Sequence, residues 1–220
     1  MKQTAGLMLS TAFAGGVLFG LSGTLQWWNG WAFLLVILAL GLMSSVAIGH
    51  TPGLAKERRT AAAGAEAWDR WVVRLTSLAM PVMLVLAALD HRAQWLPRVP
   101  RTGSVVAFLI LVPATVLTYR AIAVNRFFSS HVRIQADRGH TVVSTGPYRF
   151  LRHPGYAGSV IFNLLAPLAV GSWVAMVPGF LAAGLLVWRT SREDHFLANE
   201  LPGYADYASR VHYRLIPGVW

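Results

Sequence analysis

The chain alternates long apolar runs with short polar segments, a pattern typical of proteins that cross a membrane several times. From Gln3 to Ala55 it contains no Asp, Glu, Lys or Arg. A membrane-spanning helix needs about 20 apolar residues, so this stretch predicts two helices. The break between them falls at Ser22 to Gly30, where Gly, Asn and the cluster of Trp27, Trp28 and the adjacent Trp31 predict a turn with an aromatic belt at the membrane interface.

Three further apolar runs follow. One covers Trp71 to Leu89, with a possible kink at Pro81, and the next covers Thr102 to Ala123. The last, Pro154 to Trp188, would be about 52 Å long as one helix, whereas the hydrocarbon core of a bilayer is about 30 Å thick. It must therefore fold back, and Gly171-Ser172 near its middle predicts a helical hairpin. We expect the second arm to continue as a helix into the polar tail.

Polar segments separate these runs at His50 to Arg70, Asp90 to Arg101 and Asn125 to Arg152. The third segment is long, basic and without helical periodicity. Extended pieces with turns at Arg138-Gly139 and Gly146-Pro147 are predicted there.

The distribution of basic residues predicts which polar segments face the cytoplasm. Five Lys or Arg lie between Lys56 and Arg74, six between Arg120 and Arg152, and four between Arg189 and Arg214. The positive-inside rule then favours about five to six passes with both termini in the cytoplasm. Three Arg between Asp90 and Arg101, on the opposite side, count against that orientation.

Composition favours the same class of protein. Hydrophobic residues make up 55% of the 220-residue chain and charged residues 13%, against about 25% charged in soluble domains. A soluble helical protein is therefore disfavoured, and the apolar N-terminus is read as a retained helix rather than a cleaved signal peptide. The net charge of +10 indicates contact with anionic lipid headgroups rather than nucleic acid. With no Cys, disulfides and thiolate metal sites are excluded.

Two polar clusters flank the predicted hairpin, GPYRFLRHPGY at 146–156 and RTSRED at 189–194. A hairpin returns the chain to the side it left, so the clusters should face one another. Each residue alone has an ordinary explanation. Arg189 and Glu193 could be a helix-stabilising pair four residues apart, Arg192 and Asp194 could be solvated neighbours, and His153 could be an interfacial histidine.

Taken together, the two clusters resemble the isoprenylcysteine carboxyl methyltransferase family and its relatives among the phospholipid N-methyltransferases. The RHPxY element of that family is present as Arg152, His153, Pro154 and Tyr156. Its paired acids with a downstream Leu are present as Glu193, Asp194 and Leu197. This sequence has Asp194 where many relatives have a second Glu, and Gly155 where they often have Met or Ser.

The resemblance is strong over Asn125 to Trp220 and loose before it. Upstream similarity to bacterial members is limited to a few positions, namely Leu54, Glu57, Arg58, Trp68, Asp69 and Arg70. We therefore divide the chain into N-terminal transmembrane helices, 1–124, and a catalytic region, 125–220.

The resemblance implies an all-α, polytopic membrane helix bundle with a cytoplasmic-side pocket for S-adenosyl-L-methionine. It assigns the cofactor to Gln135, His140, Thr141, Val142, Val143, Tyr148, His153, Pro154, Gly155, Tyr156 and Glu193. It also names Arg189 and Glu193 as catalytic and places Arg189 at the acceptor. Glu193 would suit the ammonium or ribose of the cofactor. The planar fork of Arg189 would suit a carboxylate or phosphate.

Methyl transfer to a prenylcysteine-like carboxylate on a lipophilic acceptor is the favoured function. Phospholipid N-methylation is an alternative, and it would need a base such as Glu193, Asp194 or His153 to deprotonate the amine. A non-enzymatic membrane assembly factor or channel on the same scaffold is a further alternative, and it would bind no cofactor. The chain carries no G-x-G-x-x-G fingerprint, and its His residues form no close ligand pair, so no metal site is predicted. The oligomeric state stays open, and in a bacterium the location would be the inner membrane.

Overall fold

The structure is a computed structural model that describes residues 2–49, 53, 57–58 and 64–220. Leu54, one of the positions that carried the upstream resemblance, lies outside these residues. The described part is helical, with irregular segments and no strand. Its main elements are α1 (Lys2–Ser22), α2 (Trp28–Gly49), α4 (Ala67–Ala93), α5 (Arg101–Val124), α6 (Pro154–Val170), α7 (Met176–Glu200) and α8 (Tyr204–Arg210).

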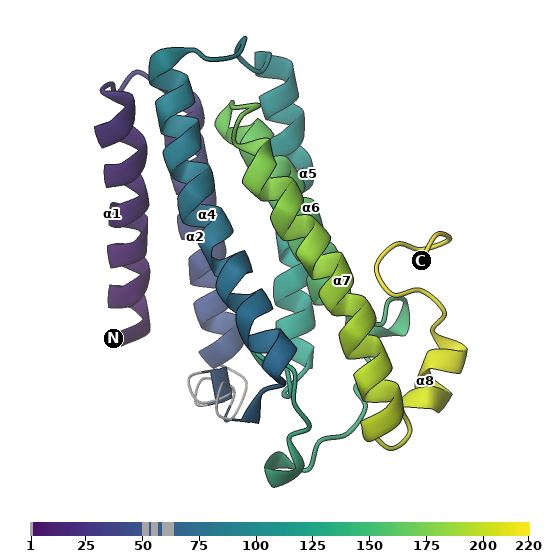
Figure 1. Ribbon diagram of the computed structural model, residues 1–220. Coiled ribbons are helices and arrows are strands. Elements are labelled where there is room, and N and C mark those ends of the chain that lie inside the picture. Colours follow the sequence, from purple (N-terminus) through teal and green to yellow (C-terminus); the bar gives the residue numbers. More distant parts are fainter. Residues whose placement is uncertain (1, 50–52, 54–56, 59–63) are drawn as a thin grey trace.

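The long helices stand side by side and alternate in direction, so their connections gather at two ends of the bundle (Figure 1). The segment between α5 and α6, the C-terminal half of α7 and the short α8 lie together at the lower end in that view. This arrangement confirms the all-α bundle and the C-terminal hairpin. The two clusters that flank the hairpin do meet at one end.

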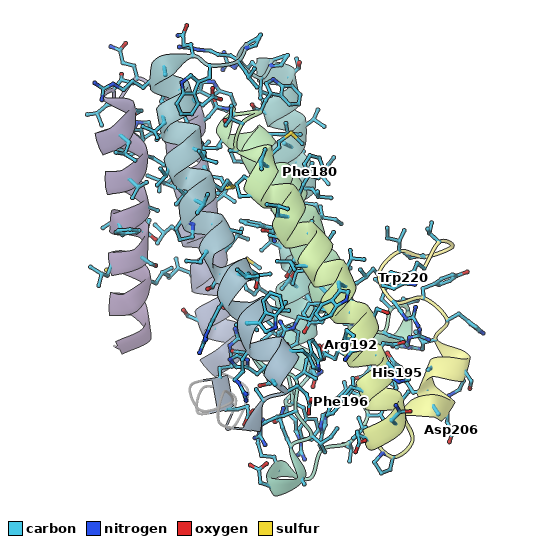
Figure 2. All side chains as sticks on the ribbon, viewed as in Figure 1. Phe180, Arg192, His195, Phe196, Asp206 and Trp220 are labelled. Atoms are coloured by element: carbon cyan, nitrogen blue, oxygen red, sulfur yellow. The ribbon has the colours of Figure 1, made fainter. Side chains whose placement is uncertain are left out.

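Apolar side chains cover the outside of the bundle. By length and composition, three helical segments of the described chain can cross a membrane: Trp28–Val46, Ala67–Ala93 and Arg101–Val124. Gly6–Ser22 and Pro154–Val170 are shorter apolar helices. Phe180 is more than half exposed, and Figure 2 shows it on the upper part of α7. Burial of such side chains needs lipid around the protein.

The hairpin turns where the sequence predicts. Gly171 has φ 94°, a left-handed backbone conformation that favours glycine. The hydroxyl of Ser172 donates to Asp90 Oδ2 at 2.6 Å, and its oxygen accepts from the amide of Ala175. The turns in the basic segment are also confirmed, because Gly139 and Gly146 both have positive φ, in short 3-10 turns at Ala136–Arg138 and Gly146–Arg149.

Helix α4 is longer at both ends than the apolar run Trp71 to Leu89 predicts. It contains Asp69 and Asp90, which the hydropathy pattern assigned to polar loops. Both side chains are buried. These carboxylates are internal partners rather than loop residues, which hydropathy alone cannot distinguish.

Helices α5 and α6 approach each other closely at Gly158. A Cβ atom there would overlap the carbonyl oxygen of Ala114 and the hydroxyl of Thr118. Small residues at helix interfaces allow such close backbone approach in membrane proteins. This contact fixes the start of α6, and therefore the RHPGY element, against α5.

We expect Gly158→Ala to destabilise the protein by about 1–3 kcal/mol, because a backbone oxygen cannot move aside as a flexible side chain can. The measurement is thermal unfolding in detergent. Gly184→Ala on α7 is the matched control, because a Cβ there meets no atom within 4 Å. Equal unfolding temperatures for the two variants would contradict a close α5–α6 contact.

Candidate functional site

A cleft opens at the end of the bundle where the basic segment, α6, α7 and α8 meet. Both polar and apolar side chains line it, as is typical of sites for small molecules. Ten of the residues proposed for the cofactor line it: Gln135, His140, Thr141, Val142, Val143, Tyr148, His153, Gly155, Tyr156 and Glu193.

Two of the predicted site residues do not line the cleft. Pro154 is the first residue of α6 and is fully buried, so it shapes the start of the helix. Arg189 lies one turn before Glu193 on α7, behind the ring of Tyr156, with its guanidinium carbon 5.2 Å from the ring centroid.

Gln135 and His140 form one wall of the cleft. The Gln135 side chain is buried and donates to the carbonyl of Phe127 at 2.7 Å. The Gln135 amide lies 3.3 Å from His140 Nδ1 and donates to it. Burial, followed by the charges of Arg133 and Arg138, lowers the pKa of His140 to about 4. This histidine is therefore neutral near pH 7, in agreement with a ring nitrogen that accepts a hydrogen bond.

The wall continues through Thr141, Val142 and Val143. Among the hydrogen bonds between the residues that the structure describes, none uses a backbone N–H of these three. Val142 and Leu197 also give the cleft apolar surface. The strip thus offers backbone donors beside an apolar wall.

Gly155 leaves room for the ring of Phe128. A Cβ atom at Gly155 would lie 2.6 Å from Cε2 of that ring. The space that a side chain at position 155 would occupy is filled by an aromatic side chain from the basic segment. Phe128 therefore closes the cleft beside the start of α6.

Asp194 connects three segments of the chain. Its carboxylate accepts from Arg152 Nη2 at 3.1 Å, Arg214 Nε at 2.7 Å and the Tyr204 hydroxyl at 2.8 Å. His153 Nε2 lies 3.2 Å from the same group. Asp194 is 6% exposed, so the alternative of a solvated residue is wrong for it. It holds the RHPGY element and the C-terminal tail against α7.

Glu193 faces the cleft from the neighbouring position. Its Oε2 accepts a hydrogen bond of 2.6 Å from the hydroxyl of Tyr156. Arg189 does not bond it, because Arg189 Nε donates to Asp69 Oδ1 at 2.7 Å and Nη2 donates to the carbonyl of Ser130 at 2.9 Å. Arg189, four positions earlier on the same helix, is thus not the hydrogen-bond partner of Glu193.

The N-terminal half of the chain contributes two carboxylates. Asp69 on α4 is fully buried and bonds both Arg189 and the amide of Val132. Glu57 accepts two hydrogen bonds from Arg133, at 2.9 and 2.6 Å, and these bonds lower the pKa of Glu57. Both pairs pin the basic segment to the bundle.

In the sequence, Glu57 and Asp69 are only points of resemblance, without a predicted role. The predicted site also lacks Asn125, Tyr204 and Tyr207, which line the cleft. One signal was available for the acids: the chain has only nine Asp or Glu against 19 Lys or Arg. An acid inside a basic segment is therefore expected to have an arginine partner.

Outside the cleft, the exposed face of α7 carries other polar residues. Figure 2 shows Arg192, His195 and Phe196 near its lower end, with Asp206 on α8 beside them. The guanidinium of Arg192 stacks on Trp68 and Trp188, at 5.6 and 5.8 Å from the ring centroids. Arg192 is thus an exposed stacking residue of the membrane boundary.

Comparison with known sequences identifies the segment that builds this site. A sequence profile of the isoprenylcysteine carboxyl methyltransferase (ICMT) family matches residues 105–199. This segment of the chain is similar to the ICMT family. The match runs from α5 through the RHPGY element to the paired acids of α7, so it contains most of the cleft.

Similar curated proteins include two plant O-methyltransferases and a bacterial metal-resistance protein. A probable protein-S-isoprenylcysteine O-methyltransferase of Oryza sativa subsp. indica is 27% identical over 112 residues, covering 47% of this chain and 56% of the relative. Protein-S-isoprenylcysteine O-methyltransferase A of Arabidopsis thaliana is 29% identical over 110 residues, or 47% and 53%. The cobalt-zinc-cadmium resistance protein CzcN of Cupriavidus metallidurans is 34% identical over 83 residues, or 36% and 37%. The chain thus spans about half the length of the plant relatives.

We expect Asp194→Asn to loosen the C-terminal tail, because Arg152 and Arg214 would lose their counter-charge. Removing one partner of a buried ion pair costs about 3–5 kcal/mol. The variant should unfold at a lower temperature in detergent, and trypsin should cut faster after Arg210 and Arg214. Asp206→Asn, at an exposed position of α8, is the control and should behave as wild type. Equal cleavage rates for the two variants would remove the clamp role from Asp194.

Proposed function

We propose that this protein transfers a methyl group from S-adenosylmethionine to the carboxylate of a membrane-associated, prenylcysteine-like acceptor. The observation that carries this proposal is the cleft itself. It combines the RHPGY element, the strip 140–143 and Glu193 at one end of a membrane helix bundle, within the segment that matches the ICMT family. The names of the plant relatives supply the acceptor class.

The cleft suits the chemical groups of the cofactor. Glu193 offers a carboxylate for its ammonium or ribose, and the backbone of 141–143 offers hydrogen bonds for adenine. The neutral His140 adds no charge against the sulfonium. When bound, S-adenosylmethionine supplies an electrophilic methyl group, and the protein positions the acceptor in line with it and excludes water.

The acceptor is better described as a carboxylate than as an amine. A carboxylate is a nucleophile at neutral pH, whereas an amine must first lose a proton to a base. Of the three candidate bases, Asp194 is occupied by two arginines and a tyrosine. His153 lies against Asp194 and Tyr204. The third candidate, Glu193, faces the cleft but is proposed here to bind the cofactor. We therefore favour O-methylation over phospholipid N-methylation.

Arg189 remains the proposed acceptor contact from the family resemblance. Its bonds to Asp69 and Ser130 hold the guanidinium behind Tyr156. In this role it would orient Tyr156 and Glu193 as well as attract an anion. We propose further that residues 1–124 anchor the protein and that 125–220 carry the reaction, because all the residues that line the cleft belong to 125–220.

The cytoplasm is the proposed side for the cleft and both termini. The cofactor is made there, and the basic segment between α5 and α6 follows the positive-inside rule. The acceptor would then reach the cleft through the lipid, and the cofactor would reach it from water.

Labelled methyl transfer tests the function directly. Purified protein in detergent is incubated with methyl-labelled S-adenosylmethionine and either N-acetyl-S-farnesylcysteine or phosphatidylethanolamine. We expect label on the farnesylcysteine in a form that mild base releases as methanol, because esters hydrolyse and N-methyl groups do not. Base-stable label on the phospholipid would instead establish N-methylation. Absence of transfer and of cofactor binding in folded protein would favour a non-enzymatic role.

We expect Glu193→Gln to weaken binding of S-adenosylmethionine about tenfold or more, because the substitution removes a charge that faces the cleft. Isothermal titration in detergent measures the affinity. Glu200→Gln, at the exposed end of the same helix, is the control and should bind as wild type. Equal affinities for all three proteins would exclude Glu193 from the cofactor site.

A further inference from the structure

Arg58 lies at the same end of the bundle as the cleft and has a buried polar atom without a partner. Its Nη1 is buried and forms no hydrogen bond with any residue that the structure describes. Its guanidinium carbon lies 5.9 Å from the centroid of the Phe128 ring. The groups that act on its charge are Tyr119, Tyr156 and Arg189. This set contains no carboxylate.

The neighbouring arginines are neutralised. Arg133 bonds Glu57, Arg189 bonds Asp69, and Arg214 bonds Asp194. A guanidinium keeps its proton under all ordinary conditions. Arg58 is half-buried, but leaving its buried Nη1 without an acceptor is costly. An acceptor for Nη1 is missing from the described part of the chain, and a bound anion would supply it.

Arg58 lies beside two residues that line the cleft. Phe128 and Tyr156 both line the cleft, and both also lie near Arg58. Phe128 fills the space above Gly155, and Tyr156 carries the hydrogen bond to Glu193. Tyr119, the third neighbour, is on α5 and packs against the apolar core of the bundle. The guanidinium thus lies between the apolar core and the cleft.

We propose that Arg58 binds the carboxylate of the lipophilic acceptor and directs one of its oxygens into the cleft. A planar guanidinium can hold a carboxylate with parallel N–H donors. The acceptor oxygen then forms a bond to the methyl carbon while the sulfur–methyl bond breaks and its electron pair stays on sulfur, so no proton moves. This assignment rests on the proposed function, and it makes Arg58 a second anion contact beside Arg189.

The acceptor tail would lie in lipid beside this end of the bundle. Apolar side chains near the lower end of α2, namely Leu42, Met43 and Val46, are exposed. A prenyl chain can remain among them while its charged end reaches Arg58 and enters the cleft beside Phe128 and Tyr156.

The test compares Arg58→Gln and Arg58→Lys with wild type in the full chain. We expect Arg58→Gln to raise the KM for N-acetyl-S-farnesylcysteine by at least about 10-fold, because a desolvated charge contact is lost. The Kd for S-adenosylmethionine should stay within about twofold, since Arg58 does not line the cleft. Arg58→Lys should give an intermediate KM. Arg120→Gln is the control, because Arg120 is an exposed arginine next to Tyr119.

Inhibition by a competing ligand distinguishes an anion contact at Arg58 from a structural role of this residue. Wild type should be inhibited more strongly by a non-methylatable farnesyl carboxylate than by its carboxamide, and Arg58→Gln should lose this preference. An unchanged KM together with an unchanged preference would overturn the assignment of Arg58. Loss of cofactor binding in both Arg58 variants would also overturn it and make Arg58 structural. If wild type binds the cofactor but methylates no carboxylate, the proposed function itself fails.

Discussion

A guanidinium that leaves water at the edge of a membrane needs an anion beside it, and this requirement organises the polar end of the protein. Asp69 supplies the anion for Arg189, Glu57 for Arg133, and Asp194 for Arg152 and Arg214. Each pair joins segments that are far apart in the sequence. The irregular basic segment, which has no ladder of backbone hydrogen bonds, is held in place by these charges.

The two adjacent acids on α7 have different surroundings and different proposed roles. Asp194 points into the protein and is saturated by cations, whereas Glu193 points into the cleft and bonds only the hydroxyl of Tyr156 among the described side chains. A helix turns by about 100° per residue, so consecutive residues face different surroundings. In the proposed reaction Glu193 serves the cofactor and Asp194 serves the fold.

Two residues that line the cleft, Phe128 and Tyr156, also lie beside Arg58. In the proposed function the two substrates meet beside these residues, one from water and one from lipid. Such an arrangement needs no aqueous path through the bundle, and the close α5–α6 contact at Gly158 keeps the start of α6 fixed.

Hydropathy and glycine positions predict the order of helices and turns in this protein. The apolar runs, the excess length of Pro154 to Trp188 and the glycines at 139, 146 and 171 predicted the helices, the hairpin and the turns, because these depend on hydropathy and on backbone conformation near each residue. The motifs around His153 and Glu193 also indicated which segments form the site.

The pairing of charges, in contrast, depends on how the helices pack in three dimensions. Spacing on one helix suggested Arg189 with Glu193, but Arg189 bonds Asp69, which lies 120 positions earlier in the chain. Hydropathy assigned Asp69 and Asp90 to loops, whereas both are buried within α4. The partner of a buried charge depends on which helices pack together and in what register, and no local pattern of residues contains that information.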